Sequence, residues 1–503
     1  MKFNLKNIFY SSLLVIIVIL AIFLRFYHLG SNAYWIDEIL LVNQLRPSFE
    51  GVCFSEGSAY TPVPRLFLII LKISSMLFGM DEFVLRFLPC LFGCLSVILF
   101  FLLCKKLSED NYFISVIATT LFAFNLRMLQ YSQTVKTYSG EIFLVLLLYY
   151  LTELYLSRNY DIRYFIAIFI ASIVGLFLFF PIIFIIPILF LRVFYVFLKE
   201  KRVGSINDLK KLKHSYAWVF YLLISGISFM INYFFLTPNP GKELLSYWKR
   251  YFLSWFDIFT NLPSRLFEFF IYLFYYAFYN MKITWIVPAL FAGLFLLGLI
   301  YLITKRKYVI LSYFLIPFFL VLLASLLGKY PFGGARVDLF LMPLIFLIIS
   351  YGLYFIFSWV KKEKIFILIS VLVFLVCFIP ALGYNNLNYD SHNEDINSLR
   401  VWYDEFKQPS DYTYITLSTL GYYQLFYHVD NYVLFPDHPE ARAKNWSLEA
   451  DSVASTCKDK RLWILSRYSD ASEKPKVLSG IIQRCTLLDS RIGKNSAGYL
   501  FSC

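Results

Sequence analysis

Long apolar stretches alternate with short polar ones along most of the chain. A bilayer core of roughly 30 Å takes about 20 apolar residues per helix, and eleven stretches approach that length. They cover residues 8–26, 83–104, 111–127, 138–156, 164–180, 182–198, 216–236, 283–304, 309–327, 338–358 and 365–382. The pattern predicts an all-α polytopic membrane protein with about eleven transmembrane helices.

Residues 383–503 lose the long apolar runs and gain Asp, Asn and Ser. Short alternating runs and helix-like runs follow one another there, which predicts a small soluble α/β domain after a transmembrane domain at 1–382. Tyr412–Leu417 and Arg461–Ser466 are strand-like, and Tyr422–His428 is amphipathic. A helix-like run, Val477–Arg484, is followed by two further short runs, Thr486–Ile492 and Ala497–Ser502.

Composition excludes a soluble enzyme, because 59% of the residues are hydrophobic and 16% are charged, against roughly 25% charged in soluble proteins. The net charge is +13. If the N-terminus is cytoplasmic, the inside segments 1–7, 105–110, 157–163, 199–215, 305–308 and 361–364 carry 18 Lys and Arg against six acidic residues. This asymmetry follows the positive-inside rule, so the basic excess reflects topology and no nucleic-acid partner is expected.

The outward side then receives residues 27–82, residues 237–282 and the tail 383–503. Short loops favour the plasma (inner) membrane of a bacterium, with the tail extracytoplasmic. The first span ends in Leu24, Arg25 and Phe26 rather than in small residues, which indicates a retained helix and not a cleaved signal peptide.

Four cysteines lie outside the spans: Cys53, Cys457, Cys485 and Cys503. An oxidising compartment would permit a bridge such as Cys457 to Cys485, although spacing does not determine the pairing. Nucleotide-binding glycine motifs and zinc-binding cysteine spacings are absent from the sequence in any suitable context.

Two adjacent acids, Asp37 and Glu38, follow the interfacial residues Tyr34 and Trp35. An acid at this depth is costly unless it lines a wet or protein-lined cavity, so the pair is a candidate site. If Ile36–Gln44 is a helix, the two carboxyls point about 100° apart and only one can aim at a reacting atom. We favour Asp37. The alternative is a solvated helix start with acids near the positive dipole end.

Two outward loops carry cations against the positive-inside trend. Lys136 lies in loop 130–138, and Arg336 ends the loop 329–336, next to two glycines. Glycine admits a close backbone approach and Arg offers a bidentate fork, so both loops suit a phosphate. Arg65 and Arg86 are weaker candidates for the same role. The alternative for each cation is a lipid-headgroup anchor, and the aromatic loop 237–282 could equally wall a groove for a lipid chain or form an interfacial belt.

The order of several short motifs resembles that of the GT-C membrane glycosyltransferases. It is most similar to the group that contains protein O-mannosyltransferases and the lipid A aminoarabinose transferase, over roughly residues 10–382. The motifs are Leu29-Gly30, Trp35-Ile36-Asp37-Glu38, Thr61-Pro62, residues 78–87, Tyr131-Ser132-Gln133, Lys136-Thr137-Tyr138 and residues 330–336.

This resemblance implies a many-helix fold with its site on the outer face and a donor sugar carried on a polyprenyl phosphate. The family's acidic motif falls on Asp37 and Glu38, its loop cation on Lys136 and its late arginine on Arg336. Thr61-Pro62 stands where many relatives have His or Lys before the proline, which speaks against a His-bound metal. Tyr60-Thr61-Pro62-Val63 replaces a Glu-Lys-Pro-Pro run, which speaks against aminoarabinose transfer to lipid A.

The chemistry agrees with that role. A phosphate whose charge is neutralised leaves without a general acid, so an inverting transfer needs one carboxylate base at the acceptor hydroxyl. The hypothesis makes Asp37 the base and Glu38 an orienting group or the ligand of a divalent metal ion. Lys136 and Arg336 clamp the phosphate, and the acceptor hydroxyl belongs to a lipid, a glycan or a protein.

Two alternatives remain. A transporter or flippase of lipid-linked sugars would also have many spans and outward cations, but it would place its charges near the midplane. A scaffold for cell-envelope enzymes would not need Asp37.

Overall fold

The computed structural model describes residues 5–31, 34, 36–54, 62–200, 208–237, 248–249, 251–274, 286–333, 336–359, 362–387, 396–416, 432–435, 453–467, 474–493 and 496–503. The chain divides into two compact units. The membrane unit comprises Met1–Leu29, Pro47–Met80 and Val84–Asn385, and the second unit comprises Gly30–Arg46, Asp81–Phe83 and Asn386–Cys503.

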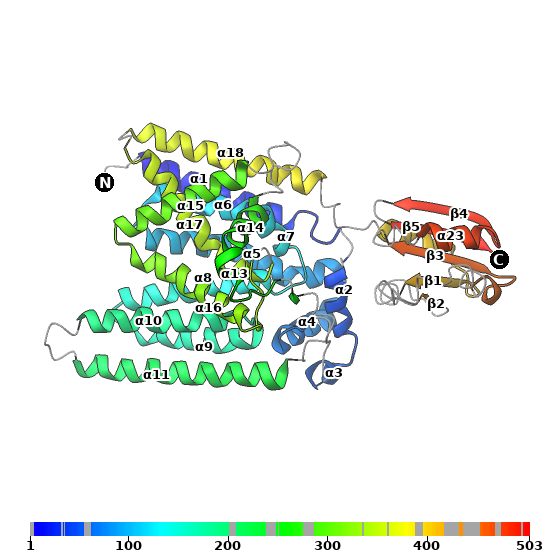
Figure 1. Cartoon of the computed structure of the whole chain (residues 1–503), viewed down its shortest axis with the longest axis horizontal. Coiled ribbons are helices and arrows are strands. Elements are labelled where there is room, and N and C mark those ends of the chain that lie inside the picture. Colours follow the sequence, from blue (N-terminus) through cyan, green and yellow to red (C-terminus); the bar gives the residue numbers. More distant parts are fainter. Residues whose placement is uncertain are drawn as a thin grey trace. The chain divides into compact units, whose positions relative to one another are not determined.

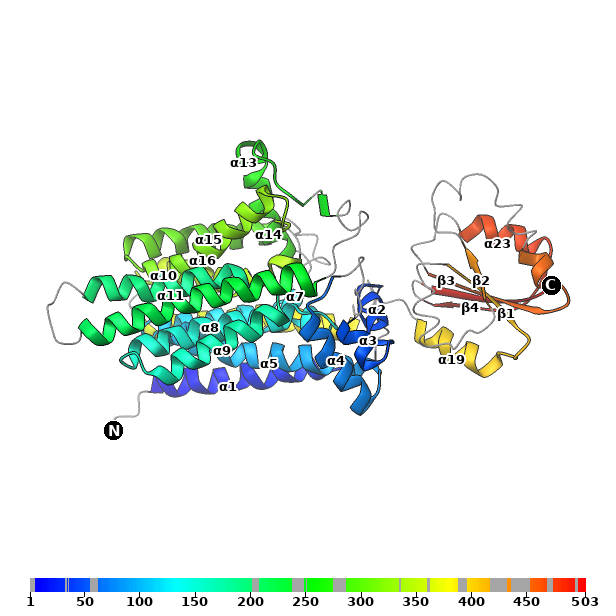
Figure 2. The same ribbon diagram turned by 90° about the horizontal axis from the view of Figure 1, so that it is seen from below.

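The membrane unit is a bundle of long helices that run side by side (Figures 1 and 2). Within the described chain, nine helices are long and apolar enough to cross a membrane, one bent pair forms a tenth span, and the 17-residue α9 is slightly shorter. All eleven predicted stretches are therefore helical, and the predicted fold class is confirmed. The helices are α1 (Leu5–Phe26), α5 (Glu82–Leu107), α6 (Tyr112–Ala123) with α7 (Leu126–Ser132), α8 (Tyr138–Ser157), α9 (Ile162–Leu178), α10 (Ile182–Glu200), α11 (Asp208–Ile231), α15 (Ile286–Thr304), α16 (Tyr308–Leu326), α17 (Met342–Phe357) and α18 (Glu363–Leu387).

Helix α17 lies at the centre of the bundle, where it packs against α6 and α15. At the crossing of α15 and α17, a Cβ on Gly298 would lie 2.0 Å from the Ile348 carbonyl oxygen, and one on Gly352 would lie 1.9 Å from that of Leu294. Only glycine permits such a backbone approach.

An ion pair inside the bundle joins three helices. Arg192 of α10 donates to both carboxylate oxygens of Glu153 on α8, at 2.9 and 3.2 Å. The Tyr313 hydroxyl of α16 donates to Glu153 Oε1 at 2.6 Å. Because both charges are paired and hydrogen-bonded, they are tolerated among the apolar spans.

Shorter elements join the spans of the membrane unit. α4, α7 and α14 lie toward the end of the bundle at which α1 ends (Figure 2). This is the end whose loops are predicted to face outward. These elements are α3 (Phe49–Phe54), α4 (Arg65–Phe78), the π-helix η2 (Asn232–Leu236), α13 (Asp257–Thr260), α14 (Leu262–Phe274) and the 3₁₀-helix η4 (Arg336–Leu341).

The second unit contains a five-stranded sheet in the order β2-β1-β3-β5-β4. β1 is parallel to both of its neighbours, whereas β5 is antiparallel to β3 and β4. The predicted α/β tail is confirmed, α19 and β2 were not predicted, and Tyr422–His428 lies outside the described residues. The elements are α19 (Ile396–Phe406), β1 (Tyr412–Thr416), β2 (Tyr432–Phe435), β3 (Arg461–Arg467), α23 (Lys474–Ile482), β4 (Thr486–Gly493) and β5 (Ser496–Ser502).

The tail carries a disulfide, but it joins Cys485 to Cys503 and not to Cys457. Cys485 directly precedes β4 and Cys503 directly follows β5, and these strands pair with Thr486 opposite Ser502. Sheet register therefore brings the two thiols together. Cys457 lies buried in the same apolar cluster without a bridge.

Candidate functional site

The third predicted span is a broken helix, since α7 leaves α6 at an angle of 57°. Asn125 begins α7: its side-chain oxygen accepts from the backbone N–H of Arg127 and Met128 at 3.1 and 3.4 Å. Its amide nitrogen donates to the Leu273 carbonyl near the end of α14, 2.9 Å away. One side chain thus satisfies backbone groups at two helix ends, as irregular backbone at membrane depth requires.

Gln133 ends α7 and holds the end of α1. Its side-chain nitrogen donates to the carbonyls of Leu24, Arg25 and Tyr27 at 3.1, 2.9 and 2.9 Å, and only 2% of the residue is exposed. These carbonyls lie at or just after the end of α1, where the helix cannot supply all of their hydrogen bonds. The bonds fix the turn that carries Lys136 against the point where the chain leaves the first span.

Lys136 and Arg336 are carried by two segments that pack together. Lys136 is buried in the turn before α8, where its N–H donates to the Thr134 carbonyl at 2.7 Å. Arg336 is half-buried and opens η4, which packs against α8. Lys136 therefore lies two residues before a helix that packs against the element that begins at Arg336.

The loop before Arg336 is held by three hydrogen bonds. The Tyr330 hydroxyl donates to the Val337 carbonyl at 2.8 Å, and the Phe332 N–H donates to the Tyr251 carbonyl at 2.9 Å. The Gly333 N–H donates to Asp338 Oδ2 at 2.9 Å. Gly333 has a φ of +86°, which a residue with a side chain rarely adopts, so this glycine shapes the loop. Gly334 and Ala335 lie outside the described residues.

Two buried acids near these cations were not predicted. Glu141 lies in the first turn of α8 and accepts the Thr137 hydroxyl at 2.6 Å. Asp338 lies in η4 and is fully buried. Burial raises the pKa of the Tyr330 hydroxyl well above its ordinary value, and the charges of Glu141 and Asp338 raise it further, so both acids lie near that ring. An acid inside an apolar stretch was the signal that could have identified them.

Tyrosine side chains surround this region. The Tyr131 and Tyr272 hydroxyls are 2.8 Å apart, and the Tyr131 and Tyr138 rings meet edge to face at 5.0 Å. The Arg127 guanidinium lies over the Tyr272 ring at 4.4 Å and donates to the Tyr272 carbonyl at 3.3 Å. Of the aromatic loop 237–282, Tyr272 is thus part of the site, whereas Tyr247, Tyr275, Tyr276 and Tyr279 lie outside the described residues.

The acid pair lies in the second unit. The predicted helix is present as α2 (Ile36–Val42), continued by the 3₁₀-helix η1 (Asn43–Leu45). Asp37 and Glu38 occupy its first turn, where the helix dipole favours negative charge. Glu38 is 1% exposed and Asp37 is half-buried. Asp37 is therefore the more accessible carboxyl of the two.

Arg65 and Arg86 bond to backbone carbonyls of the membrane unit. Arg65 donates to the Val52 carbonyl of α3 at 2.8 Å, and burial lowers its pKa. Arg86 is 2% exposed and donates to the Leu29 carbonyl at 3.3 Å. Both guanidinium groups therefore brace the segments on either side of the acid-bearing helix.

A metal ion finds no ligand set among the described residues. No group of three or more His, Cys, Asp and Glu side chains lies together in that part of the chain. Glu38 with Asp37 alone does not provide the three or four protein ligands of a zinc site.

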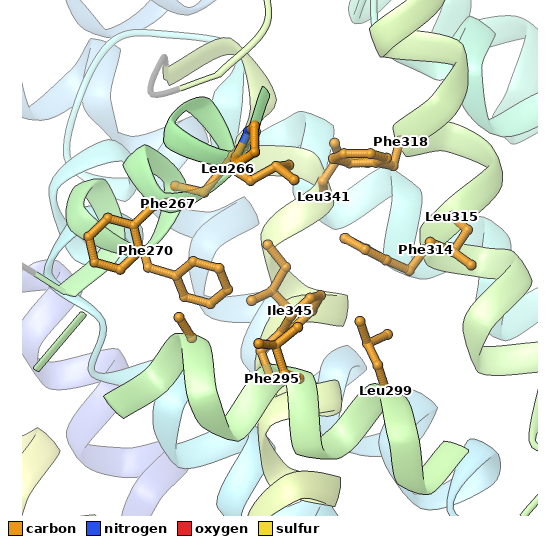
Figure 3. Close-up of a pocket in the computed structure, with 14 residues that line it drawn as sticks. Leu266, Phe267, Phe270, Phe295, Leu299, Phe314, Leu315, Phe318, Leu341 and Ile345 are labelled. Carbon is orange, nitrogen blue, oxygen red and sulfur yellow. The ribbon is translucent and has the colours of Figure 1, made fainter. Parts of the chain in front are cut away.

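An apolar cavity of about 420 Å³ opens between α14, α15, α16 and α17 (Figure 3). Phenylalanines from three of these helices point into it, among them Phe270, Phe295 and Phe318. The same helix α14 ends at Tyr272 and Leu273, against α7. The cavity and the tyrosine cluster are thus joined by one helix.

The fold of the chain is similar to that of solved ArnT structures, which agrees with the GT-C fold expected from the resemblance in sequence. ArnT from Cupriavidus metallidurans in the apo state is similar over 97% of this chain and 98% of its own, with a TM-score of 0.55 and 12% identity. The same protein bound to undecaprenyl phosphate has a TM-score of 0.53 and 11% identity over the same shares. At such identities the likeness concerns the fold.

The oligosaccharyltransferase of Archaeoglobus fulgidus, in complex with zinc and sulfate, is similar over 92% of this chain and 68% of its own. Its TM-score is 0.51 and its identity is 14%. No protein-family model matches the chain, and no curated protein sequence matches it either.

Proposed function

We propose that this protein is a membrane glycosyltransferase that moves a sugar from a polyprenyl phosphate to a cell-envelope hydroxyl on the outer face, with inversion. The observation that supports the proposal is the packing of η4, which begins at Arg336, against α8, which begins two residues after Lys136, in a bundle whose fold is similar to that of ArnT. ArnT from Cupriavidus metallidurans, which shares that fold, binds undecaprenyl phosphate.

The apolar cavity between α14 and α17 is the proposed place for part of the lipid chain. Its lining is almost wholly aliphatic and aromatic, as an isoprenyl chain requires. α14 leads from this cavity to Tyr272, so a lipid held there would extend its phosphate toward the cationic segments. Lys136 and Arg336 would then be the counter-ions of the charged phosphate oxygens.

The reaction needs one base. The acceptor oxygen attacks the anomeric carbon, the bond from that carbon to the phosphate oxygen breaks, and the hydroxyl proton passes to the Asp37 carboxylate. Polyprenyl phosphate leaves with the bonding pair, and Lys136 and Arg336 stabilise the charge that develops on it. Glu38 orients the first turn of α2.

The test compares the wild type with Asp37→Asn in detergent, with a panel of radiolabelled polyprenyl phosphosugars and a cell-envelope extract. We expect the variant to lose release of polyprenyl phosphate by a factor of about 100 or more while donor binding persists, since a positioned base contributes roughly 10²–10⁴-fold. Glu50→Gln, at an exposed position of α3, is the control and should release at the wild-type rate.

Undiminished release by Asp37→Asn would move the base elsewhere, with Glu38 next. Binding without release from any donor would instead favour a flippase of lipid-linked sugars.

A further inference from the structure

Glu141 and Asp338 each keep one carboxyl oxygen without a hydrogen bond. Glu141 is 4% exposed and Asp338 is fully buried. Glu141 Oε1 accepts the Thr137 hydroxyl and Asp338 Oδ2 accepts the Gly333 N–H. Among the described residues, neither Glu141 Oε2 nor Asp338 Oδ1 has a hydrogen-bond partner.

Such oxygens are costly, because a buried acceptor that has left water without a new partner loses the full solvation of that group. The chain does satisfy a buried carboxylate elsewhere on the same helix. Both oxygens of Glu153 on α8 accept from Arg192, and one accepts from Tyr313 as well. An unsatisfied buried group in a native structure needs an explanation, and a bound group that supplies the missing hydrogen bond is one.

The two acids belong to one cluster of the membrane unit. α8 and η4 pack together, and Glu141 and Asp338 both raise the pKa of the Tyr330 hydroxyl. Tyr138 also raises the pKa of the Tyr330 hydroxyl, and the Tyr138 ring packs edge to face against the Tyr131 ring. Each cationic residue has an acid of this cluster close by in sequence: Glu141 follows Lys136, and Asp338 follows Arg336.

The ligand chemistry follows from this pairing of charges. The phosphate of a phosphodiester offers only acceptor oxygens, so it cannot donate to the carboxyl oxygens that lack a partner. A hydroxyl group donates, and tyrosine rings with a few fixed polar groups are a common lining of pockets for small organic ligands. A ligand that presents hydroxyl donors beside a phosphate meets both needs.

We infer that Glu141 and Asp338 accept hydrogen bonds from hydroxyl groups of the donor sugar, so that this cluster binds a glycosyl phosphate in preference to a plain phosphate. The inference rests on the proposed function and identifies the sugar-recognising part of its site. Glu141 and Asp338 are then residues that determine donor specificity, alongside the phosphate-binding cations.

The test measures two dissociation constants in detergent: that of a polyprenyl phosphosugar and that of the same polyprenyl phosphate without sugar. Hydrogen bonds to charged groups are worth enough to change affinity by roughly 10- to 100-fold. Glu141→Gln and Asp338→Asn should each raise the phosphosugar Kd by about that factor and leave the phosphate Kd within about twofold of the wild type. Glu153→Gln on the same helix is the matched control and should leave the ratio of the two constants unchanged.

Thermal unfolding without ligand separates this role from a structural one. Removal of a buried acid that has an unsatisfied oxygen should keep or raise the Tm of the Glu141 and Asp338 variants, whereas Glu153→Gln removes one partner of an ion pair and should lower it. A lowered Tm with both constants unchanged would overturn the inference, as would equal weakening of both ligands. A wild type that binds polyprenyl phosphate but no phosphosugar would reject the proposed function itself.

Discussion

Gln133 joins two segments of the membrane unit. Its three hydrogen bonds hold the end of α1, which lies eleven residues before Asp37 in the sequence, against the turn that carries Lys136. Gln133→Met keeps the side-chain length and removes the donor. We expect it to lower kcat at least tenfold and to lower stability by about 1–3 kcal/mol, the range for unsatisfied buried groups. Steady-state kinetics and thermal unfolding measure the two effects.

Asn232→Leu provides the matched control for Gln133→Met. Asn232 is also a buried amide that closes a helix end, since it donates to the Leu176 carbonyl near the end of α9 at 2.7 Å. Its loss should reduce stability to a similar degree and leave kcat unchanged. Equal loss of kcat in both variants would mean that Gln133 acts through stability alone, and rescue by Gln133→Asn would support its positioning role.

At this scale the sequence identified only candidates. Lys136 and Arg336 were proposed because a cation in an outward loop departs from the charge bias of the other loops. Glu141 and Asp338 were missed because one acid near the end of an apolar stretch barely changes its mean hydropathy. The role of Gln133 was beyond sequence reasoning, since its carbonyl partners lie more than 100 residues away.

At the scale of elements, the crossing of α15 and α17 depends on glycine. Gly298→Ala would place a methyl group 2.0 Å from the Ile348 carbonyl oxygen, so the helices must separate. We expect a loss of about 1–3 kcal/mol, as for other overpacked cores. Gly293→Ala on the same helix meets nothing within 4 Å and should be neutral or stabilising by up to about 1 kcal/mol. Unfolding in detergent compares them, and equal stability of the two variants would contradict the close crossing.

The helices themselves followed from hydropathy, whereas the break between α6 and α7 did not. A sliding average of hydropathy includes Asn125 and Arg127 among apolar neighbours, so it predicts one continuous span, 111–127, across the bend. The local signal was Asn125, a favoured N-cap residue, and its second bond to the Leu273 carbonyl is a tertiary contact. β2 was missed because its four residues are too few to show an alternating pattern, whereas the apolar residues of α19 do recur at helical spacing and were overlooked.

At the scale of the whole molecule, the tail can test which side of the membrane each loop faces. Positive-inside loops predict that residues 383–503 lie outside the cytoplasm, and a disulfide persists only in an oxidising compartment. The Cys485–Cys503 bond provides an independent test of the predicted orientation. Burial raises the pKa of the Cys457 thiol to about 11, so this third cysteine is a poor nucleophile and should not compete for the bridge.

The experiment traps thiols in cells, denatures the protein and counts maleimide adducts before and after reduction. We expect Cys485 and Cys503 to react only after reduction, and Cys457→Ser to leave that pattern unchanged. Cys485→Ser should destabilise the tail by about 3 kcal/mol, the value for a loop of roughly 15 residues. If both cysteines react without reduction, the tail faces a reducing compartment. The proposed base and phosphate clamp would then face the cytoplasm, where a donor presented on the outer leaflet could not reach them.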